Sequence, residues 1–239
     1  MAARFERAVV VGASGGIGGA LATRLADLGT VVDALSRLGA ARDARLSAGI
    51  IDVEDEASIA NAARAISAES PIDLVIVASG LLHAEGIVPE KSYLQVSGAS
   101  FERYFAVNAT GPMLVAKHFL PLLAKDRTSV FAALSARVGS INDDRLGGWY
   151  GYRASKAALN MIVKTLSVEL ARTHPQAACV ALHPGTVATD LSLPFQRGVP
   201  AEKLFSPETA AKHLLNVIEG LSASDSGRSL AWDGSAILA

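Results

Sequence analysis

One tyrosine and one lysine, four residues apart, have the types and spacing that acid–base chemistry requires. Tyr152 and Lys156 lie in the segment Tyr-Arg-Ala-Ser-Lys, and no other of the four tyrosines has a lysine at this spacing. On a helix, residues four apart share one face and lie a turn from each other. A phenol keeps its proton to about pH 10, and a nearby ammonium favours the phenolate and lowers the phenol's pKa. The pair therefore predicts a general acid or base.

A glycine-rich turn predicts a second kind of site. Residues 12–18 read Gly-Ala-Ser-Gly-Gly-Ile-Gly, after a short apolar run and before an amphipathic segment. Such a turn lets the backbone approach a pyrophosphate, and the helix that follows offers free N–H groups and a partial positive charge. Many such turns are only structural, but a strand before and a helix after favour a dinucleotide site. The residues assigned to it are Gly12, Ser14, Gly15, Gly16, Ile17 and Gly18.

The end of the second predicted strand favours NADP(H) over NAD(H). An NAD site places an acidic residue there for the ribose hydroxyls, whereas an arginine accommodates a 2′-phosphate. Asp33 falls near the expected spacing, but the apolar run continues past it, so that Ser36 and Arg37 end the strand. Arg37 is therefore assigned to the phosphate, with a solvated surface arginine as the alternative. NAD(H) stays the second choice of cofactor.

Asp52, which precedes Val53 at the end of the third predicted strand, has two interpretations. Its carboxylate can accept a hydrogen bond from the adenine amino group of a cofactor, or it can cap the helix that follows. Asp55 is the better-placed N-cap for that helix. Both interpretations of Asp52 stay open.

Short β-branched runs alternate with longer segments of helical periodicity, which predicts βαβ units and a parallel sheet. The runs are almost continuously apolar, as strands covered by helices on both faces are. The expected fold class is α/β, a single-domain, doubly wound Rossmann fold of about seven strands over residues 1–239. The expected strands are Ala8–Gly12, Val31–Ser36, Gly49–Val53, Leu74–Ala78, Ser129–Ser135, Ala178–His183 and Ser229–Trp232. The expected helices are Ile17–Leu28, Asp55–Ala68, Ser100–Leu123, Tyr152–Thr173 and Pro207–Leu221.

Two long irregular stretches, residues 79–99 and 184–206, follow predicted strands. Long loops in a compact domain are usually functional or mobile, and open α/β sheets bind ligands at the carboxyl ends of their strands. We therefore expect both loops to line the substrate site. Leu193 and Phe195, with Leu204 and Phe205, predict an apolar pocket under a mobile lid.

Composition excludes several classes of function. The 22 Lys and Arg and the 23 Asp and Glu leave a net charge of −1, so we expect neither a nucleic-acid nor an anionic-membrane surface. The apolar run Ala8–Val11 is too short for an export signal, and the other apolar stretches are too short to span a bilayer. The single cysteine, Cys179, fits a reducing compartment. These features favour a cytoplasmic protein with a small-molecule substrate, and the histidine spacing predicts no metal site.

Five motifs occur in the order typical of the short-chain dehydrogenases/reductases, and the chain resembles that family over nearly its whole length. The motifs are the glycine-rich turn at 12–18, Asp52-Val53, Val107-Asn108-Ala109, the Tyr152–Lys156 segment and His183-Pro184-Gly185-Thr186-Val187-Ala188-Thr189. The chain looks most similar to the branch of sniffer-type carbonyl reductases and bacterial C-factor proteins. The resemblance implies hydride transfer between a nicotinamide cofactor and a carbonyl compound or its alcohol.

The resemblance also implies roles for individual residues. Tyr152 would exchange a proton with the substrate oxygen, while Lys156 would lower the pKa of Tyr152 and hold the nicotinamide ribose. Asn108 would keep its helix irregular and anchor a water that links Lys156 to solvent. Ser79 and Gly80 match the turn that approaches the cofactor after the fourth strand. The residues expected against the carboxamide end of the nicotinamide are Pro184, Gly185, Val187 and Thr189.

The family's catalytic serine has no simple counterpart. The family places two serines at the end of the fifth strand and uses the second, whereas this chain has Ser135-Ala136. Aligned on Gly139, the customary position is Ala136. Ser135 is kept as the catalytic candidate, with Ser140 as a second one. Because neighbouring side chains on a strand point to opposite faces, Ser135 reaches the substrate only if the loop shifts by one residue.

Two functions are in competition. The first is an NADP(H)-dependent reductase of a ketone or aldehyde, with Tyr152 as general acid. The alternative is a non-catalytic NADP(H)-binding regulatory or C-factor-like signalling protein, which the Ala136 departure favours. The intact Tyr152 and Lys156 pair argues against the alternative, since a sensor has no need of it.

The helix expected over Tyr152–Thr173 has more apolar surface than one face packed on a sheet needs. Members of the family pair this helix and the long helix before it across a two-fold axis, so the resemblance implies a homodimer or homotetramer. Cover by the chain's own segment Trp232–Ala239 is the alternative.

Overall fold

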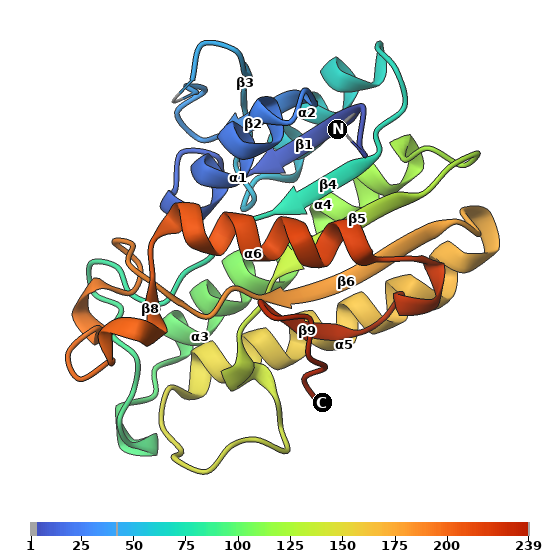
Figure 1. Ribbon diagram of the computed structural model, residues 1–239. Helices are drawn as coiled ribbons and strands as arrows, with labels where there is room; N and C mark the ends of the chain where they lie inside the picture. The colour runs from blue at the N-terminus through green and yellow to red at the C-terminus, as the bar shows by residue number, and fades with distance from the viewer. Residues whose placement is uncertain (1–3, 42, 239) are drawn as a thin grey trace.

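Parallel strands form the central sheet of the computed structural model, which describes residues 4–41 and 43–238 (Figure 1). Within that part of the chain the sheet has seven strands in the order β3-β2-β1-β4-β5-β6-β9. The order reverses between β1 and β4, and ligands of open α/β sheets bind at such a point, beyond the carboxyl ends of the strands. The strands are β1 Arg7–Val11, β2 Val31–Ser36, β3 Ser47–Ile50, β4 Leu74–Val77, β5 Ser129–Leu134, β6 Ala177–His183 and β9 Ser229–Ala231. Residues 1–3, 42 and 239, which the one-domain prediction includes, lie outside the described residues.

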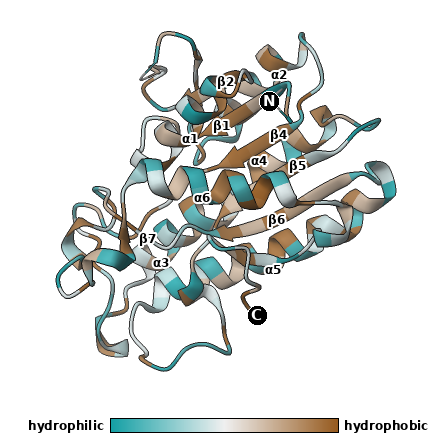
Figure 2. Ribbon diagram, viewed as in Figure 1, coloured by the Kyte–Doolittle hydropathy of each residue, from teal (hydrophilic) through white to brown (hydrophobic). Residues whose placement is uncertain are grey.

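Helices cover both faces of the sheet, and the brown strands between mixed brown and teal helices in Figure 2 show where the apolar core lies. Helices α1 and α6 bury Leu21 and Leu214 on one face, and α2, α4 and α5 bury Ile59, Phe119 and Leu159 on the other. This arrangement confirms the predicted doubly wound α/β fold. The helices are α1 Gly16–Asp27, α2 Glu56–Ser67, α3 Gly98–Phe105, α4 Gly111–Phe119, α5 Tyr150–Thr173 and α6 Pro207–Gly220.

Two predicted elements differ from the structure. The third strand was expected over Gly49–Val53, but β3 ends at Ile50, where its pairing partner β2 ends at Ser36, so Asp52 and Val53 follow the strand. The single helix expected over Ser100–Leu123 begins at Gly98 and is interrupted by a π-helical turn, Ala106–Thr110. Asp55 is the N-cap of α2, as predicted, and accepts the N–H of Ala57.

The two long loops have structure of their own. Residues 79–99 contain a 3₁₀ turn, Tyr93–Gln95. Residues 184–206 contain β7 Thr186–Val187 and β8 Leu204–Phe205, which pair with each other in parallel. This pairing brings the two ends of the second loop together, so the residues between β7 and β8 form a loop with adjacent ends. Further 3₁₀ turns are Leu120–Leu122, Arg137–Gly139, Leu193–Phe195, Ala201–Lys203 and Ala223–Asp225.

None of the described helices combines the length and the hydrophobicity that crossing a membrane requires.

A buried arginine at the start of β1 explains why Asp33 is unsuited to a ribose. Arg7 is only 2% exposed, and its Nε donates to Asp33 Oδ2 at 3.1 Å across the β1–β2 pairing. Its Nη1 donates to the carbonyl of Ile66, in the last turn of α2, and to that of Ser70, just after the helix. Burial raises the pKa of Asp33 above its ordinary value, and Arg7 opposes that rise. Asp33 lies inside β2, as the sequence predicts, and the structure adds that it belongs to an ion pair.

We expect Arg7→Ala to lower the free energy of unfolding by about 3–5 kcal/mol, because it leaves the Asp33 carboxylate buried without its partner. The control is Arg45→Ala, which removes an exposed arginine paired with Asp27 and Asp43 and is expected to cost less than about 1 kcal/mol. Urea unfolding of both variants measures the difference. Equal losses for the two arginines would contradict this account.

Candidate active site

Tyr152 lies in the first turn of α5, in an apolar cluster at the carboxyl edge of the sheet. It is 8% exposed, and its ring makes edge contacts with Tyr104 at 6.3 Å and Trp149 at 6.2 Å between centroids. Buried Leu82 belongs to the same cluster, and so do the half-buried Ala136, Val138, Leu191 and Phe195. The two long loops therefore meet around Tyr152, as the sequence predicts for a substrate site.

Lys156 lies one turn further along α5 and is 3% exposed. Its Nζ donates to the carbonyl of Leu134, the last residue of β5, at 2.8 Å. The same ammonium lies 5.9 Å from the centre of the Tyr152 ring. Tyr152 and Lys156 thus share one helical face, as their spacing predicts, and that face is turned toward the sheet edge.

The pKa values of this pair correct one expectation. Burial raises the pKa of the Tyr152 phenol, and Tyr104 adds to the rise, whereas Lys156 was expected to lower it. Burial lowers the pKa of Lys156 to about 8. The physical reason is that both groups are removed from water, and desolvation disfavours the charged form of each. A phenol in this environment keeps its proton at neutral pH.

Asn108 fastens the first loop to the helix layer. It lies in the π-helical turn, which confirms the expected irregularity, and it is fully buried. Its Oδ1 accepts the N–H of Leu81 and its Nδ2 donates to the Leu81 carbonyl, both at 2.8 Å. Nδ2 also donates to Ser155 Oγ at 3.1 Å. A β-carbon added to Gly80 would lie 3.7 Å from Asn108 Oδ1 and 3.8 Å from Lys156 Nζ, so the loop, Asn108 and Lys156 meet at this point.

The glycine-rich turn is built for close backbone approach. Gly12 has a φ of +89°, and a β-carbon there would lie 2.8 Å from the backbone nitrogen of Ser79. A β-carbon on Gly18 would collide with the Gly12 carbonyl. Gly15 is the N-cap of α1 and has no side chain with which to cap it. The first turn of α1 therefore presents its N–H groups at the point where the strand order reverses.

Other residues beside this turn have the properties of a dinucleotide cradle. Among the described side chains, the hydroxyls of Ser36 and Ser79 are buried without a hydrogen-bond partner. Ser36 ends β2 and Ser79 lies two residues after β4, so both are at the carboxyl ends of the two strands that neighbour β1. A β-carbon on Gly16 would lie 2.7 Å from Thr189 Cγ2, so the second loop reaches the N-terminus of α1. Two buried hydroxyls without hydrogen-bond partners, beside a glycine-rich turn, fit a bound nucleotide.

The remaining predicted cofactor residues lie around this cradle. Arg37 is exposed directly after β2, where a phosphate from solvent can reach it. Asp52 is half-buried and accepts the N–H of Glu54, while Val53 is buried against α4 at Gly111.

The segment after β6 also contains a glycine with a left-handed backbone. Gly185 has a φ of +79°, and a β-carbon there would lie 2.8 Å from the ring of Phe205. Pro184 and buried Val187 flank it on the same segment, which leads from β6 to Thr189.

Ser135 and Ala136 point in different directions. The Ser135 hydroxyl donates to Asn160 Oδ1 at 2.7 Å, and Asn160 lies two turns beyond Tyr152 on α5. The side chain of Ala136 packs instead in the Tyr152 cluster. The loop shift that would bring Ser135 to Tyr152 is absent from this structure. Ser140 is buried and accepts the N–H of Asp143.

Two residues of the site were missed in the sequence. Tyr104 is fully buried against Tyr152, and its hydroxyl donates to the Leu82 carbonyl at 2.8 Å. Its position four residues before Asn108, on one face of a predicted helix, could have indicated it. Glu90 lies in the loop after β4, is 3% exposed and contacts the start of α5. Nothing in the loop's sequence indicates this contact.

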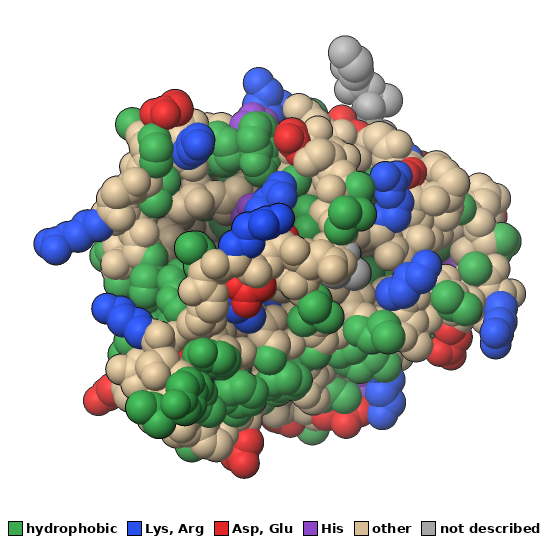
Figure 3. All heavy atoms as spheres, turned by 90° about the horizontal axis from the view of Figure 1, so that it is seen from below, with side chains coloured by type: hydrophobic (Ala, Val, Ile, Leu, Met, Phe, Trp, Pro, Cys, Tyr) green, Lys and Arg blue, Asp and Glu red, His purple; other side chains and the backbone are tan. Residues whose placement is uncertain are grey.

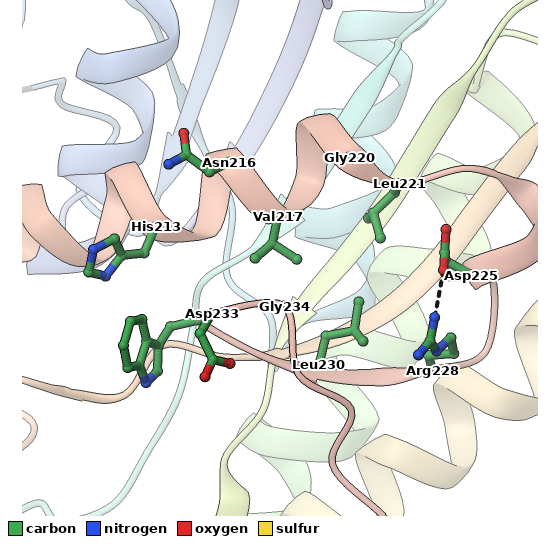
Figure 4. Close-up of a pocket in the computed structure, with 11 residues that line it drawn as sticks. His213, Asn216, Val217, Gly220, Leu221, Asp225, Arg228, Leu230, Asp233 and Gly234 are labelled. Atoms are coloured by element: carbon green, nitrogen blue, oxygen red, sulfur yellow. Dashed lines mark hydrogen bonds and ion pairs between the residues drawn. The ribbon is translucent and has the colours of Figure 1, made fainter.

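A separate cavity of about 440 Å³ lies between α6 and β9. Figure 4 shows His213 and Val217 on the side of α6 that faces Leu230 and Asp233, with the Asp225–Arg228 ion pair at one end. Its lining includes none of the residues assigned to cofactor or catalysis.

Comparisons with known proteins show what the chain is similar to. A family model for short chain dehydrogenases matches residues 6–198. The C-signal of Myxococcus xanthus is 34% identical over 168 residues, which cover 70% of this chain and 92% of that protein. The 1-hydroxy-2-glutathionyl-2-methyl-3-butene dehydrogenase of Rhodococcus sp. (strain AD45) is 32% identical over 232 residues, 95% of this chain and 96% of that protein. The solved structure of an NADPH-bound carbonyl reductase from chicken fatty liver superposes with a TM-score of 0.83 at 26% identity, covering 99% of this chain and 100% of that one.

These likenesses confirm the family, and the branch of C-factor proteins and carbonyl reductases, that the five motifs indicate. The matched residues include the glycine-rich turn, Asn108, Tyr152 and Lys156. The chain belongs to the short-chain dehydrogenase family of oxidoreductases.

Proposed function

We propose that the chain is an NADP(H)-dependent reductase of ketones or aldehydes, in which Tyr152 donates a proton to the substrate oxygen. The observation that carries the proposal is the buried cluster of Tyr152, Lys156 and Asn108, which meets Gly80 at the carboxyl edge of the sheet. A phenol and an ammonium on one helical face, beside a turn suited to a dinucleotide, supply an acid next to a cofactor site.

The cofactor is NADP(H) rather than NAD(H), because the cradle ends in Ser36 and Arg37. Arg37 would bind the 2′-phosphate. Asp33, the acidic residue near the spacing expected for a contact with the ribose hydroxyls of NAD, is instead held by Arg7. The similar carbonyl reductase from chicken fatty liver was solved with NADPH bound, which supports the same choice. The first turn of α1 would hold the pyrophosphate, with Ser79 and Gly80 beside it. Thr189 and the Pro184–Val187 segment would hold the nicotinamide end, and Asp52 the adenine.

The protein's own groups would handle the proton and the charge. When bound in this cradle, the nicotinamide would supply the hydride that the carbonyl carbon accepts. As the carbonyl π electrons move to oxygen, Tyr152 donates its hydroxyl proton to that oxygen, so that an alcohol and a phenolate result. The raised pKa of Tyr152 keeps this proton in place before the reaction. Lys156 places a positive charge near the phenolate. Asn108 donates to Ser155 and so joins the first loop to α5, the helix that carries Tyr152 and Lys156.

The substrate wall is apolar and aromatic. Trp149 and Phe195 are in edge contact at 5.0 Å, and Leu82 and Leu191 complete the wall around Tyr152. Such a lining favours a carbonyl compound with an apolar or aromatic substituent over one with a charged group. Leu191 and Phe195 come from the second loop, of which residues 189–206 would act as the lid.

We expect the chain to consume NADPH faster than NADH with apolar aldehydes or ketones, and Tyr152→Phe to lower kcat by roughly 100- to 10,000-fold. The loss follows because phenylalanine keeps the ring packing but has no proton to donate. Nicotinamide absorbance measures turnover, and Tyr150→Phe, which changes the partly exposed neighbour, is the control. Full activity in Tyr152→Phe would exclude this mechanism.

Ser135 and Ala136 give a second prediction. Because the Ser135 hydroxyl is directed to Asn160, we expect Ser135→Ala to retain kcat within about threefold of the wild-type value. Ala136→Ser adds a hydroxyl beside Tyr152 and should raise kcat, since a second donor stabilises the developing oxyanion. Steady-state kinetics with one carbonyl substrate compares the three proteins. A loss in Ser135→Ala like that of Tyr152→Phe would make Ser135 the catalytic serine after all.

A regulatory protein that binds NADP(H) without turnover is the second candidate. Its support is the likeness to the C-signal of Myxococcus xanthus together with the alanine at position 136. Tight NADPH binding, with no reduction of a broad panel of carbonyl compounds by either the wild type or Ala136→Ser, would favour it. The cytoplasmic location that the sequence favours stays a prediction.

We also propose that α4 and α5 pair with a second copy of the chain. Met161 on α5 is 66% exposed and Val168 is 53% exposed. Figure 3, which views the molecule from below, shows hydrophobic side chains gathered at one edge of the surface. The C-terminal residues Ala236–Leu238 and Met161 of α5 line the same cavity of about 680 Å³.

We expect light scattering to give the mass of a dimer or tetramer, and Met161→Glu to shift the protein toward the monomer by placing a charge in the interface. The control is Ile50→Glu, which changes an exposed residue on the edge strand β3 and should leave the mass unchanged. A stable wild-type monomer would end this proposal.

A further inference from the structure

The first turn of α5, which carries Tyr152, begins in an unusual way. Its N-cap, Trp149, has a φ of +54° and is the one non-glycine residue with positive φ in the described part of the chain. The side chain of Trp149 makes no capping hydrogen bond to the helix. The N–H groups of a helix start need acceptors, and Ser, Thr, Asp or Asn at the N-cap usually supplies one. The helix therefore needs an acceptor from elsewhere.

Glu90, from the loop after β4, supplies that acceptor. Its backbone carbonyl accepts the N–H of Trp149 at 2.5 Å, and its Oε2 accepts the N–H of Gly151 at 3.3 Å. The side chain is almost fully buried, so this carboxylate lies at the positive end of α5 with little access to water. It caps the helix from a segment about 60 residues away in sequence.

The fit around Glu90 is close. A β-carbon on Gly148 would lie 3.1 Å from the Glu90 carbonyl, and one on Gly151 would lie 3.2 Å from Glu90 Oε1 and closer still to the Tyr104 ring. Glycine at these two positions lets the loop, the helix start and Tyr104 pack together. Trp149 and Tyr104, the neighbours on either side of this contact, are the two rings that touch Tyr152.

The same loop is held at its other end. Asn108 binds the backbone of Leu81, and Tyr104 donates to the carbonyl of Leu82. Burial and the Glu90 charge raise the pKa of Tyr104 to about 12, which keeps its hydroxyl a donor. Glu90 is therefore the attachment between the far end of the loop and the helix that carries the acid.

We propose that Glu90 is a positioning residue for Tyr152, whose carboxylate accepts the Gly151 N–H and so fixes the first turn of α5 and the rings around the phenol. The inference rests on the proposed reductase function. A group that acts through geometry changes kcat more than cofactor binding, because small displacements of an acid are costly.

The test compares Glu90→Ala, Glu90→Gln and the control Glu85→Ala, which changes an exposed glutamate of the same loop. Turnover is expressed per NADPH-binding site, so that a partly unfolded sample does not count as a slow one. We expect Glu90→Ala to lower kcat at least tenfold with KM for NADPH within about twofold. Glu90→Gln should restore at least half of kcat, because its amide oxygen still accepts the Gly151 N–H. Glu85→Ala should match the wild type.

Two results would overturn the inference: a kcat within twofold of wild type in Glu90→Ala, or an equal loss in Glu90→Gln and Glu90→Ala. If Glu90→Ala does not fold, Glu90→Met keeps the side-chain length without the acceptor, and the same limits apply.

Amide hydrogen exchange gives a readout that needs no turnover. Exchange at Gly151 should quicken at least tenfold in Glu90→Ala and stay unchanged in Glu85→Ala. Unchanged exchange at Gly151 in Glu90→Ala would overturn the inference even in a protein that reduces nothing. A wild type without turnover defeats the proposed function alone.

Discussion

The attachment of α5 to the carboxyl edge of the sheet is the constraint on which the site depends. Lys156 buries an ammonium against the carbonyl that ends β5, and this contact keeps the face that also carries Tyr152 turned inward. Burial of a charge has a cost, which appears as the lowered pKa of Lys156. This unfavourable burial occurs where Lys156 lies close to Tyr152, beside a turn whose glycines leave room for a dinucleotide.

The loop after β4 is held by side chains from the helix layer as well as by its own turns. Asn108 reaches it from a π-helical turn, and that turn makes room for a side chain that a regular helix interior would direct elsewhere. Tyr104 and the start of α5 hold the rest of it. One wall of the substrate site therefore has the rigidity of the helices behind it. The opposite wall, between β7 and β8, is joined at its ends by the pairing of these two strands. Its middle contacts the first loop, where His83 Nε2 donates to the Asp190 carbonyl at 2.9 Å.

At the end of β5, the alternation of side chains directs Ser135 and Ala136 to different surroundings. Ser135 faces Asn160 and Ala136 faces Tyr152, as expected for adjacent residues of an extended segment. The hydroxyl that the family places beside its tyrosine therefore has no counterpart from this strand end. In the proposed reaction the donor is therefore the Tyr152 phenol, whose pKa burial raises.

The sequence by itself determined the alternation of strands and helices, the parallel sheet, the glycine-rich turn and the shared face of Tyr152 and Lys156. Each of these follows from local periodicity or from the steric freedom of glycine, which neighbouring residues decide. It also placed Asp33 inside β2, because the apolar run continues past it. Only the tertiary structure decided where β3 ends, which way Ser135 points, that burial raises the pKa of Tyr152, and that Glu90 caps α5. Those outcomes depend on solvent exclusion and on contacts between segments far apart in the chain, and no local pattern carries that information.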